Sequence, residues 1–176
     1  MSLLDKDNFD RFPTVRDPAR RVTGALLQGM RFTDTCKDCV LILEGMPLTA
    51  AALHEQAHWY GEAWDEFGDL LHQRHLLQEF PATPELDEAP DVGRSLEVTL
   101  WCLDEADLAL QEFARACDGA GLFALARGAE EMSVAVSGQR SRWLQAAKMW
   151  ENDPDKLSYD KWVGALFCPT RGEEAD

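Results

Sequence analysis

The chain has 176 residues, 45% of them hydrophobic, which suffices for one domain with a substantial core. With 32 acidic and 17 basic residues, its formal net charge of −15 at pH 7 disfavours nucleic acid and anionic membranes and favours a basic protein partner or a cation. Neither a membrane span nor a signal peptide is recognisable, and five cysteines occur without an export signal, so we expect reduced thiols and a cytoplasmic protein.

The first helix is predicted to begin at Asp17-Pro18, because Asp is a preferred N-cap and Pro is accepted at the first helical position. Residues 1–16 would then form an N-terminal extension. Apolar residues continue the helix at helical spacing, namely Val22, Leu26 and Met30. The helix is expected to reach about Glu44, although residues 40–43 also fit a short strand, and Gly45-Met46-Pro47 ends the element in either case.

The second helix is predicted from near Thr49 to about Glu79 and is the most periodic segment of the chain. Six apolar residues share one narrow arc that we expect to face the core: Leu53, Ala57, Tyr60, Trp64, Phe67 and Leu71. Residues 80–94 contain three prolines and four acids, so this segment is predicted to be a solvated crossover without regular structure.

The third helix is predicted from Ser95, as its N-cap, to Cys117, followed by a turn at residues 118–121. The fourth is predicted from Leu122 to Trp150, with Ser137-Gly138 as a site for a kink. The residues expected to face inward are Leu96, Leu100, Leu103, Leu110 and Ala114 on the third helix and Leu122, Leu125, Ala129, Met132, Val136 and Trp143 on the fourth.

A short fifth helix is predicted from Asp153-Pro154 to Lys161-Trp162, with Cys168-Pro169 ending it before a frayed acidic tail at residues 169–176. Long amphipathic helices joined by short turns, with one crossover, predict an all-α fold: a single-domain four-helix bundle with a short fifth helix at its C-terminal end. An α+β fold would depend on residues 40–43 alone, and one strand cannot build a sheet.

Residues 54–58 read His-Glu-Gln-Ala-His, an H-E-x-x-H motif. On a helix, His54 and His58 project from the same face and could bind one metal ion, and Glu55 has the position of the general base in a zinc hydrolase. The segment resembles the active-site helix of the zincin metallopeptidases. That resemblance implies His54 and His58 as zinc ligands and Glu55 as the base that activates water.

Asp65 and His72 extend this motif into a row beside the apolar arc, a position at which helical bundles often hold metal. A third zincin ligand stays open, because Trp64 occupies the next ligand position of the longer motif. Distant carboxylates that could serve instead are Glu97, Glu105, Glu130 and Glu131. The same row also fits a bundle without metal, since a polar helix face shows carboxylates and boundary histidines at helical spacing.

Glu55 and His58 also form one Glu-x-x-His pair that resembles the ligand pairs of ferritin-like di-iron bundles. Glu44 and either Glu97 or Asp104 could supply the single carboxylates of such a site. The chain departs from this pattern because it has no histidine after position 75, so the second pair is missing.

A structural zinc site is the third metal hypothesis. Cys36 and Cys39 precede His54 and His58 with the spacing C-x2-C-x14-H-x3-H, which lies within the range of zinc sites. If the chain turns at the two cysteines, four ligands could surround one ion; if both cysteines lie in mid-helix, this closure becomes awkward.

Two functions from different classes follow. The favoured prediction is a non-catalytic acidic helical protein, such as an adaptor, an inhibitor or an assembly factor, that binds a basic protein partner. The alternative is a metal-binding helical protein or a metal-dependent hydrolase that uses His54, Glu55 and His58 with zinc or iron. The oligomeric state stays open.

Overall fold

The computed structural model describes residues 12–72, 78–81, 89–152 and 154–167. Within them the chain is all-α, with five helices: α2 (Pro13–Ile42), α3 (Pro47–Leu71), α4 (Val92–Gly119), α5 (Phe123–Asn152) and the short α6 (Lys156–Phe167). This confirms the predicted fold class of four long helices with a short fifth one. The strand alternative is excluded, because residues 40–42 are the end of α2 and Leu43 is a turn.

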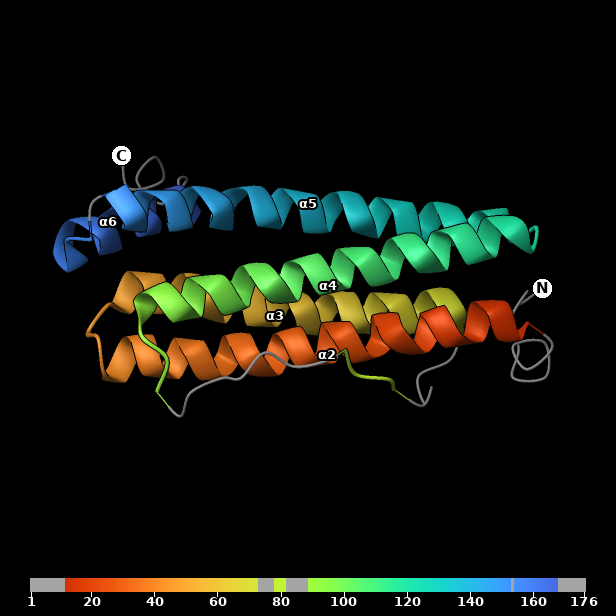
Figure 1. Ribbon diagram of the computed structural model, residues 1–176, viewed down its shortest axis with the longest axis horizontal. Coiled ribbons are helices and arrows are strands. Elements are labelled where there is room, and N and C mark those ends of the chain that lie inside the picture. Colours follow the sequence, from red (N-terminus) through yellow and green to blue (C-terminus); the bar gives the residue numbers. More distant parts are fainter. Residues whose placement is uncertain (1–11, 73–77, 82–88, 153, 168–176) are drawn as a thin grey trace.

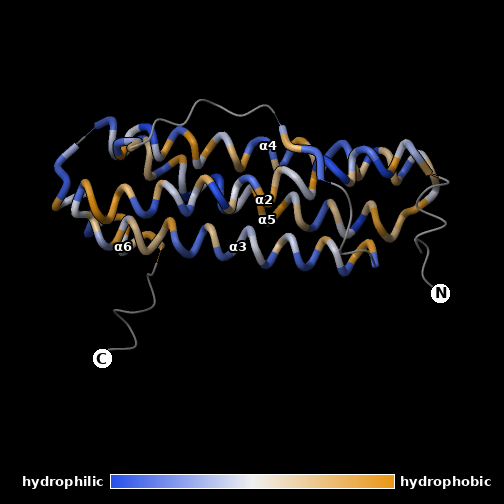
Figure 2. The backbone as a smooth tube through the Cα atoms, turned by 90° about the horizontal axis from the view of Figure 1, so that it is seen from below, coloured by the Kyte–Doolittle hydropathy of each residue, from blue (hydrophilic) through white to orange (hydrophobic). Residues whose placement is uncertain are grey.

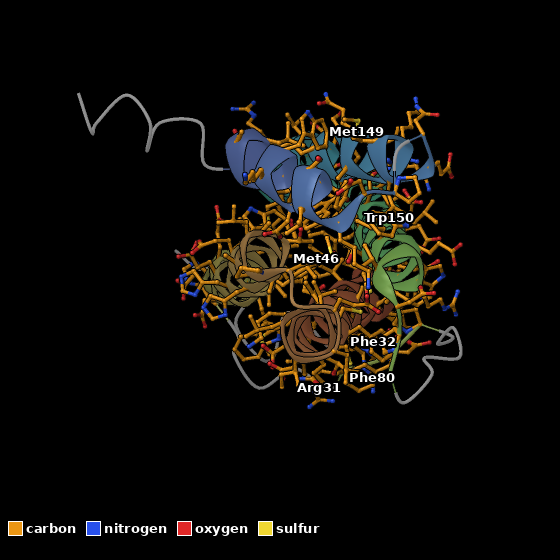
Figure 3. All side chains as sticks on the ribbon, turned by 90° about the vertical axis from the view of Figure 1, so that its left-hand side faces the viewer. Arg31, Phe32, Met46, Phe80, Met149 and Trp150 are labelled. Carbon is orange, nitrogen blue, oxygen red and sulfur yellow. The ribbon has the colours of Figure 1, made fainter. Side chains whose placement is uncertain are left out.

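The four long helices are arranged so that α2 packs against both α3 and α4, and α4 packs against α5. As Figure 1 shows, α3 and α4 run in the same direction, opposite to α2. Two contacts hold the crossover on α2: the Glu79 amide donates to the Arg20 carbonyl at 3.1 Å, and the Arg31 guanidinium lies 5.8 Å from the centre of the Phe80 ring (Figure 3).

The fourth side of the bundle is incomplete. Although α3 and α5 face each other, they make few contacts, and α6 packs mainly against α3 at one end of this side. Figure 3, which looks along the bundle, places α2 opposite α5 and α6, with α3 and α4 on the two flanks. The line along which α3 faces α5 is called the α3–α5 seam below.

The core follows the predicted apolar rows. Figure 2 shows hydrophobic and hydrophilic residues alternating along each helix, as expected for amphipathic helices with one buried face. All residues predicted to face inward on the second, third and fourth helices are buried, except that Trp64 and Leu100 are half-buried at the edge of the core. The largest fully buried side chains include Trp143, Tyr60 and Tyr159.

The predicted start of the first helix was wrong. α2 begins at Pro13 and Pro18 lies inside it, so residues 13–16 are helical and do not belong to an extension. Pro13 takes the first helical position itself, where the missing amide proton has no cost, and Pro18 removes only one hydrogen bond of the second turn. Residues 1–11 lie outside the described part of the chain.

The start of the third helix also differs from the prediction. Asp91, not Ser95, is the N-cap of α4, and its Oδ1 accepts a hydrogen bond from the Arg94 amide at 2.7 Å. Residues 92–94 are therefore helical instead of belonging to the crossover. Asp91 was taken for one more acid of the proline-rich segment, whereas its carboxylate satisfies an amide of the first helical turn.

Two helices end five or more residues away from their predicted C-terminal ends. α3 ends at Leu71 instead of Glu79, because His72 adopts a left-handed conformation (φ 53°) and its amide bonds back to Asp69 at 3.1 Å. α6 begins at Lys156 and reaches Phe167, beyond the predicted end at Trp162. α5 continues as a helix through Ser137-Gly138, and the predicted tail at 169–176 lies outside the described residues.

Asp160 fastens α6 to the rest of the bundle. Its carboxylate accepts hydrogen bonds from the backbone amides of Leu48 and Thr49 in the first turn of α3, at 3.2 and 2.7 Å. On the adjoining turn, Lys156 forms an ion pair with Glu44. Among the described helices, none has the length and apolar character needed to cross a membrane.

Candidate functional site

The H-E-x-x-H motif lies on the solvent side of α3. His54, Glu55 and His58 are all exposed, and the two histidines are one helical turn apart, as their spacing predicts. His58 Nε2 lies 3.0 Å from Glu62 Oε1, so this imidazole is paired along its own helix. The motif therefore has the helical geometry of a two-histidine site without the surroundings of a buried metal centre.

The remaining candidate ligands do not join these histidines. Asp65 is exposed on α3, whereas His72 leaves the row because the helix ends one residue before it. Among the described residues, no three side chains of His, Cys, Asp or Glu gather closely enough to hold a metal ion. The distant candidates for a third zincin ligand were Glu97, Glu105, Glu130 and Glu131, and none of them completes the site.

The two cysteines lie within the last two turns of α2, so the chain is helical between them and does not turn there; in this arrangement zinc closure is awkward. Cys36 is fully buried beside Ser95 of α4, and burial raises the pKa of its thiol to about 11. Cys39 is half-buried, one turn further along α2. A raised pKa disfavours the thiolate that zinc requires. Among the described residues, the four proposed ligands do not gather around one point.

The carboxylates considered for a di-iron centre have other partners. Glu44 pairs with Lys156 beyond the end of α2, and Asp104 Oδ1 accepts a hydrogen bond from Arg140 Nε at 2.5 Å. Glu97 Oε2 lies 3.1 Å from Arg94 Nη1. These ion pairs leave the Glu55–His58 pair without the carboxylates that a di-iron site would need.

We expect metal removal to leave the fold unchanged. Dialysis against EDTA should shift the melting temperature by less than about 1 °C, because the described residues bring at most two potential metal ligands together and two ligands contribute little folding energy. Circular dichroism melting together with elemental analysis measures this. Stoichiometric zinc or iron that disappears in His54→Ala and His58→Ala would contradict the expectation.

A groove of about 430 Å³ opens on the α3–α5 seam, beside the motif. Its walls come from three helices: Ala52, Glu55, Gln56, His58, Trp59 and Glu62 of α3, Gln139 and Arg142 of α5, and Phe167 of α6. Glu55 and His58 therefore do line a cavity, but the group on the opposite helix is a guanidinium instead of a third metal ligand.

The base of the groove is held by buried aromatic and amide groups. Trp143 Nε1 donates to Gln56 Oε1 at 3.0 Å, and the Phe167 ring packs 4.4 Å from the Trp143 ring. Gln56 is only 2% exposed, and its Nε2 has no hydrogen-bond partner among the described residues. Trp59 is half-buried and packs edge-on against Tyr60 at 5.4 Å.

Beside the two histidines, the exposed side of α3 carries five carboxylates. We call this surface the α3 acidic face; it consists of Glu55, Glu62, Asp65, Glu66 and Asp69. No Lys or Arg occurs between residues 47 and 71, and within the described residues Glu55, Asp65 and Glu66 have no ion pair. Other helices pair their acids across the bundle, for example Glu112 with Arg21 at 3.2 Å.

Sequence reasoning noted the carboxylates of α3 but missed the groove. The signal for the acidic face was present, since 25 consecutive helical residues lack any Lys or Arg. No local sequence pattern could have assigned Arg142 or Phe167 to the groove, because these residues reach α3 only through the packing of α5 and α6. No protein-family model and no curated protein matches the chain.

Proposed function

We propose that the protein is a non-catalytic interaction module, such as an adaptor, an inhibitor or an assembly factor, whose α3 acidic face binds a basic segment of a protein partner. The observation that carries this proposal is that one helix exposes five carboxylates and contains no Lys or Arg of its own, beside an open groove. The carboxylates repel phosphate backbones, so a protein segment fits this face better than a nucleic acid.

The acidic face is unfavourable for the isolated helix. Four pairs of acids stand three or four residues apart: Glu62 with Asp65, Glu62 with Glu66, Asp65 with Asp69, and Glu66 with Asp69. Each like-charge pair of this spacing destabilises a helix by roughly 0.2–0.5 kcal/mol. Cations of a partner would relieve this repulsion, which favours binding and accelerates encounter.

The dimensions of the face suit a short helix or an extended segment. Glu55 and Asp69 are 14 residues apart, which corresponds to about 21 Å along the helix axis. The groove beside them contains Trp59, an aromatic residue of the kind enriched where proteins bind each other. A basic amphipathic segment could thus place its cations on the carboxylates and an apolar side chain against Trp59.

The test uses a designed lysine-rich amphipathic helical peptide, titrated into the protein by calorimetry at low and high salt. Charge reversal in Glu62→Lys/Glu66→Lys should weaken binding about 30-fold, because two attractive contacts become repulsive. The matched control is Glu130→Lys/Glu131→Lys, which changes the net charge equally on exposed positions of α5. Equal losses in both variants would show that only the net charge matters, and this would refute the proposed face.

Metal binding by His54 and His58, with zinc or iron and with Glu55 as a base, is the second proposal. The observation in its favour is that Glu55 and His58 both line the groove. The elemental analysis described above decides it, and Glu55→Gln would abolish hydrolysis while leaving the metal bound.

A further inference from the structure

The groove on the α3–α5 seam carries opposite charges on its two walls. Glu55 and Glu62 stand on α3, whereas Arg142 and the amide of Gln139 stand on α5. Among the described residues, neither Glu55 nor Arg142 has an ion pair, although both line the same cavity. The α3 wall thus carries carboxylates, and the α5 wall carries a guanidinium.

The remaining groups in the groove suit the apolar part of a small molecule. Trp59 and Phe167 contribute aromatic surface, and Ala52 contributes a small apolar side chain. The volume of about 430 Å³ lies in the range of small-molecule sites. Aromatic surface together with a few polar groups is the usual composition of such a site.

Gln56 provides an independent indication of a ligand. This residue lines the groove and is 98% removed from solvent, since its exposure is 2%. Its Oε1 is occupied by Trp143 Nε1, which leaves the buried Nε2 as a donor without a partner among the described residues. Buried donors are rarely left unsatisfied, so an acceptor on a ligand would complete this one.

We propose that this groove binds a zwitterionic small molecule with an apolar, ring-containing body, its cationic end against Glu55 and Glu62 and its anionic end against Arg142 and Gln56. The site does not depend on the proposed protein partner. A singly charged molecule would satisfy one wall and leave the other without a partner, so the groove discriminates in favour of a molecule that carries both charges.

The experiment uses three probes that share one benzene ring: 4-(aminomethyl)benzoate, which carries both charges at opposite ends, benzylamine and benzoate. Binding is followed by NMR at the indole N–H of Trp59, which Trp59→Phe assigns. We expect 4-(aminomethyl)benzoate to bind at least about tenfold more tightly than either analogue. Equal affinity of the three probes, or no shift for any of them, would overturn the proposal.

Two variants at exposed positions test the contributions of the α5 wall and the α3 wall separately. Arg142→Gln should abolish the preference over benzylamine, and Glu55→Gln/Glu62→Gln should abolish the preference over benzoate. The control is Arg127→Gln, an exposed arginine of α5 outside the groove, which should retain both preferences. If Arg127→Gln and Arg142→Gln change the preference over benzylamine equally, the groove is not the binding site. Lysine-peptide binding is measured separately, so this result leaves the proposed partner face intact.

Discussion

Replacing Asp160 with alanine is expected to lower the free energy of unfolding by about 3 kcal/mol. The Asp160 carboxylate accepts three hydrogen bonds at the start of α3: from the amides of Leu48 and Thr49, and from Thr49 Oγ1 at 2.9 Å. The amides belong to the first turn of the helix, where backbone donors have no partner within the helix. A negative charge at this end also interacts favourably with the helix dipole.

The size of the effect follows from burial and from the lack of a substitute. Asp160 is 8% exposed, and the residue at the N-cap position, Met46, makes no side-chain hydrogen bond. Hydrogen bonds to a charged group contribute roughly 1.5–3 kcal/mol each, and some are replaced by water when the carboxylate is removed. Loss of Asp160 should therefore weaken both the start of α3 and the attachment of α6.

Urea unfolding followed by circular dichroism measures this loss. The matched control is Asp155→Ala, because Asp155 caps α6 through the exposed amides of Leu157 and Ser158, at 3.1 and 3.2 Å. A local cap of this kind contributes about 1 kcal/mol. If Asp160→Ala is no more destabilising than Asp155→Ala, the link between α6 and α3 is not the source of stability.

The same contact explains why helix interiors were predicted better than helix ends. The apolar arc of α3 depends on periodicity within one segment, so Leu53, Tyr60 and Phe67 could be assigned to the core from the sequence. The start of α3 is capped by a residue 111 positions away along the chain. The local sequence at Pro47 or Thr49 therefore cannot predict a capping residue that belongs to another helix.

Part of the candidate site could likewise be predicted from the sequence, and part could not. Helical spacing correctly placed His54 and His58 one turn apart on α3. The prediction that His72 continues the row failed, because one left-handed residue ends the helix. Arg142 reaches the groove only through the packing of α5 beside α3, and this depends on the whole bundle. Sequence patterns therefore identified which side chains share a helix face, but not what lies opposite that face.

Alkaline pH is expected to destabilise the protein strongly. Three fully buried thiols have pKa values raised by burial: Cys36 to about 11, Cys117 to about 12 and Cys102 further still, from an ordinary value of 9.0. In the unfolded chain these thiols ionise near their ordinary value. The unfolded state thus releases protons first, so their contribution to stability is complete below about pH 9 and declines as the pH rises towards the folded pKa values.

Each buried thiol should lower the free energy of unfolding by about 1.4 kcal/mol per pH unit above 9, so three thiols remove about 6 kcal/mol at pH 10.5. This is comparable with the total stability of a typical domain. Burial also raises the pKa of Tyr60, which adds a further loss above about pH 10. Urea midpoints at pH 8, 9.5 and 10.5 measure the decline. In Cys36→Ala/Cys102→Ala/Cys117→Ala the thiol contribution disappears, so the urea midpoint should decline markedly less with pH. If the variant and the unchanged protein lose stability in parallel, other groups cause the decline.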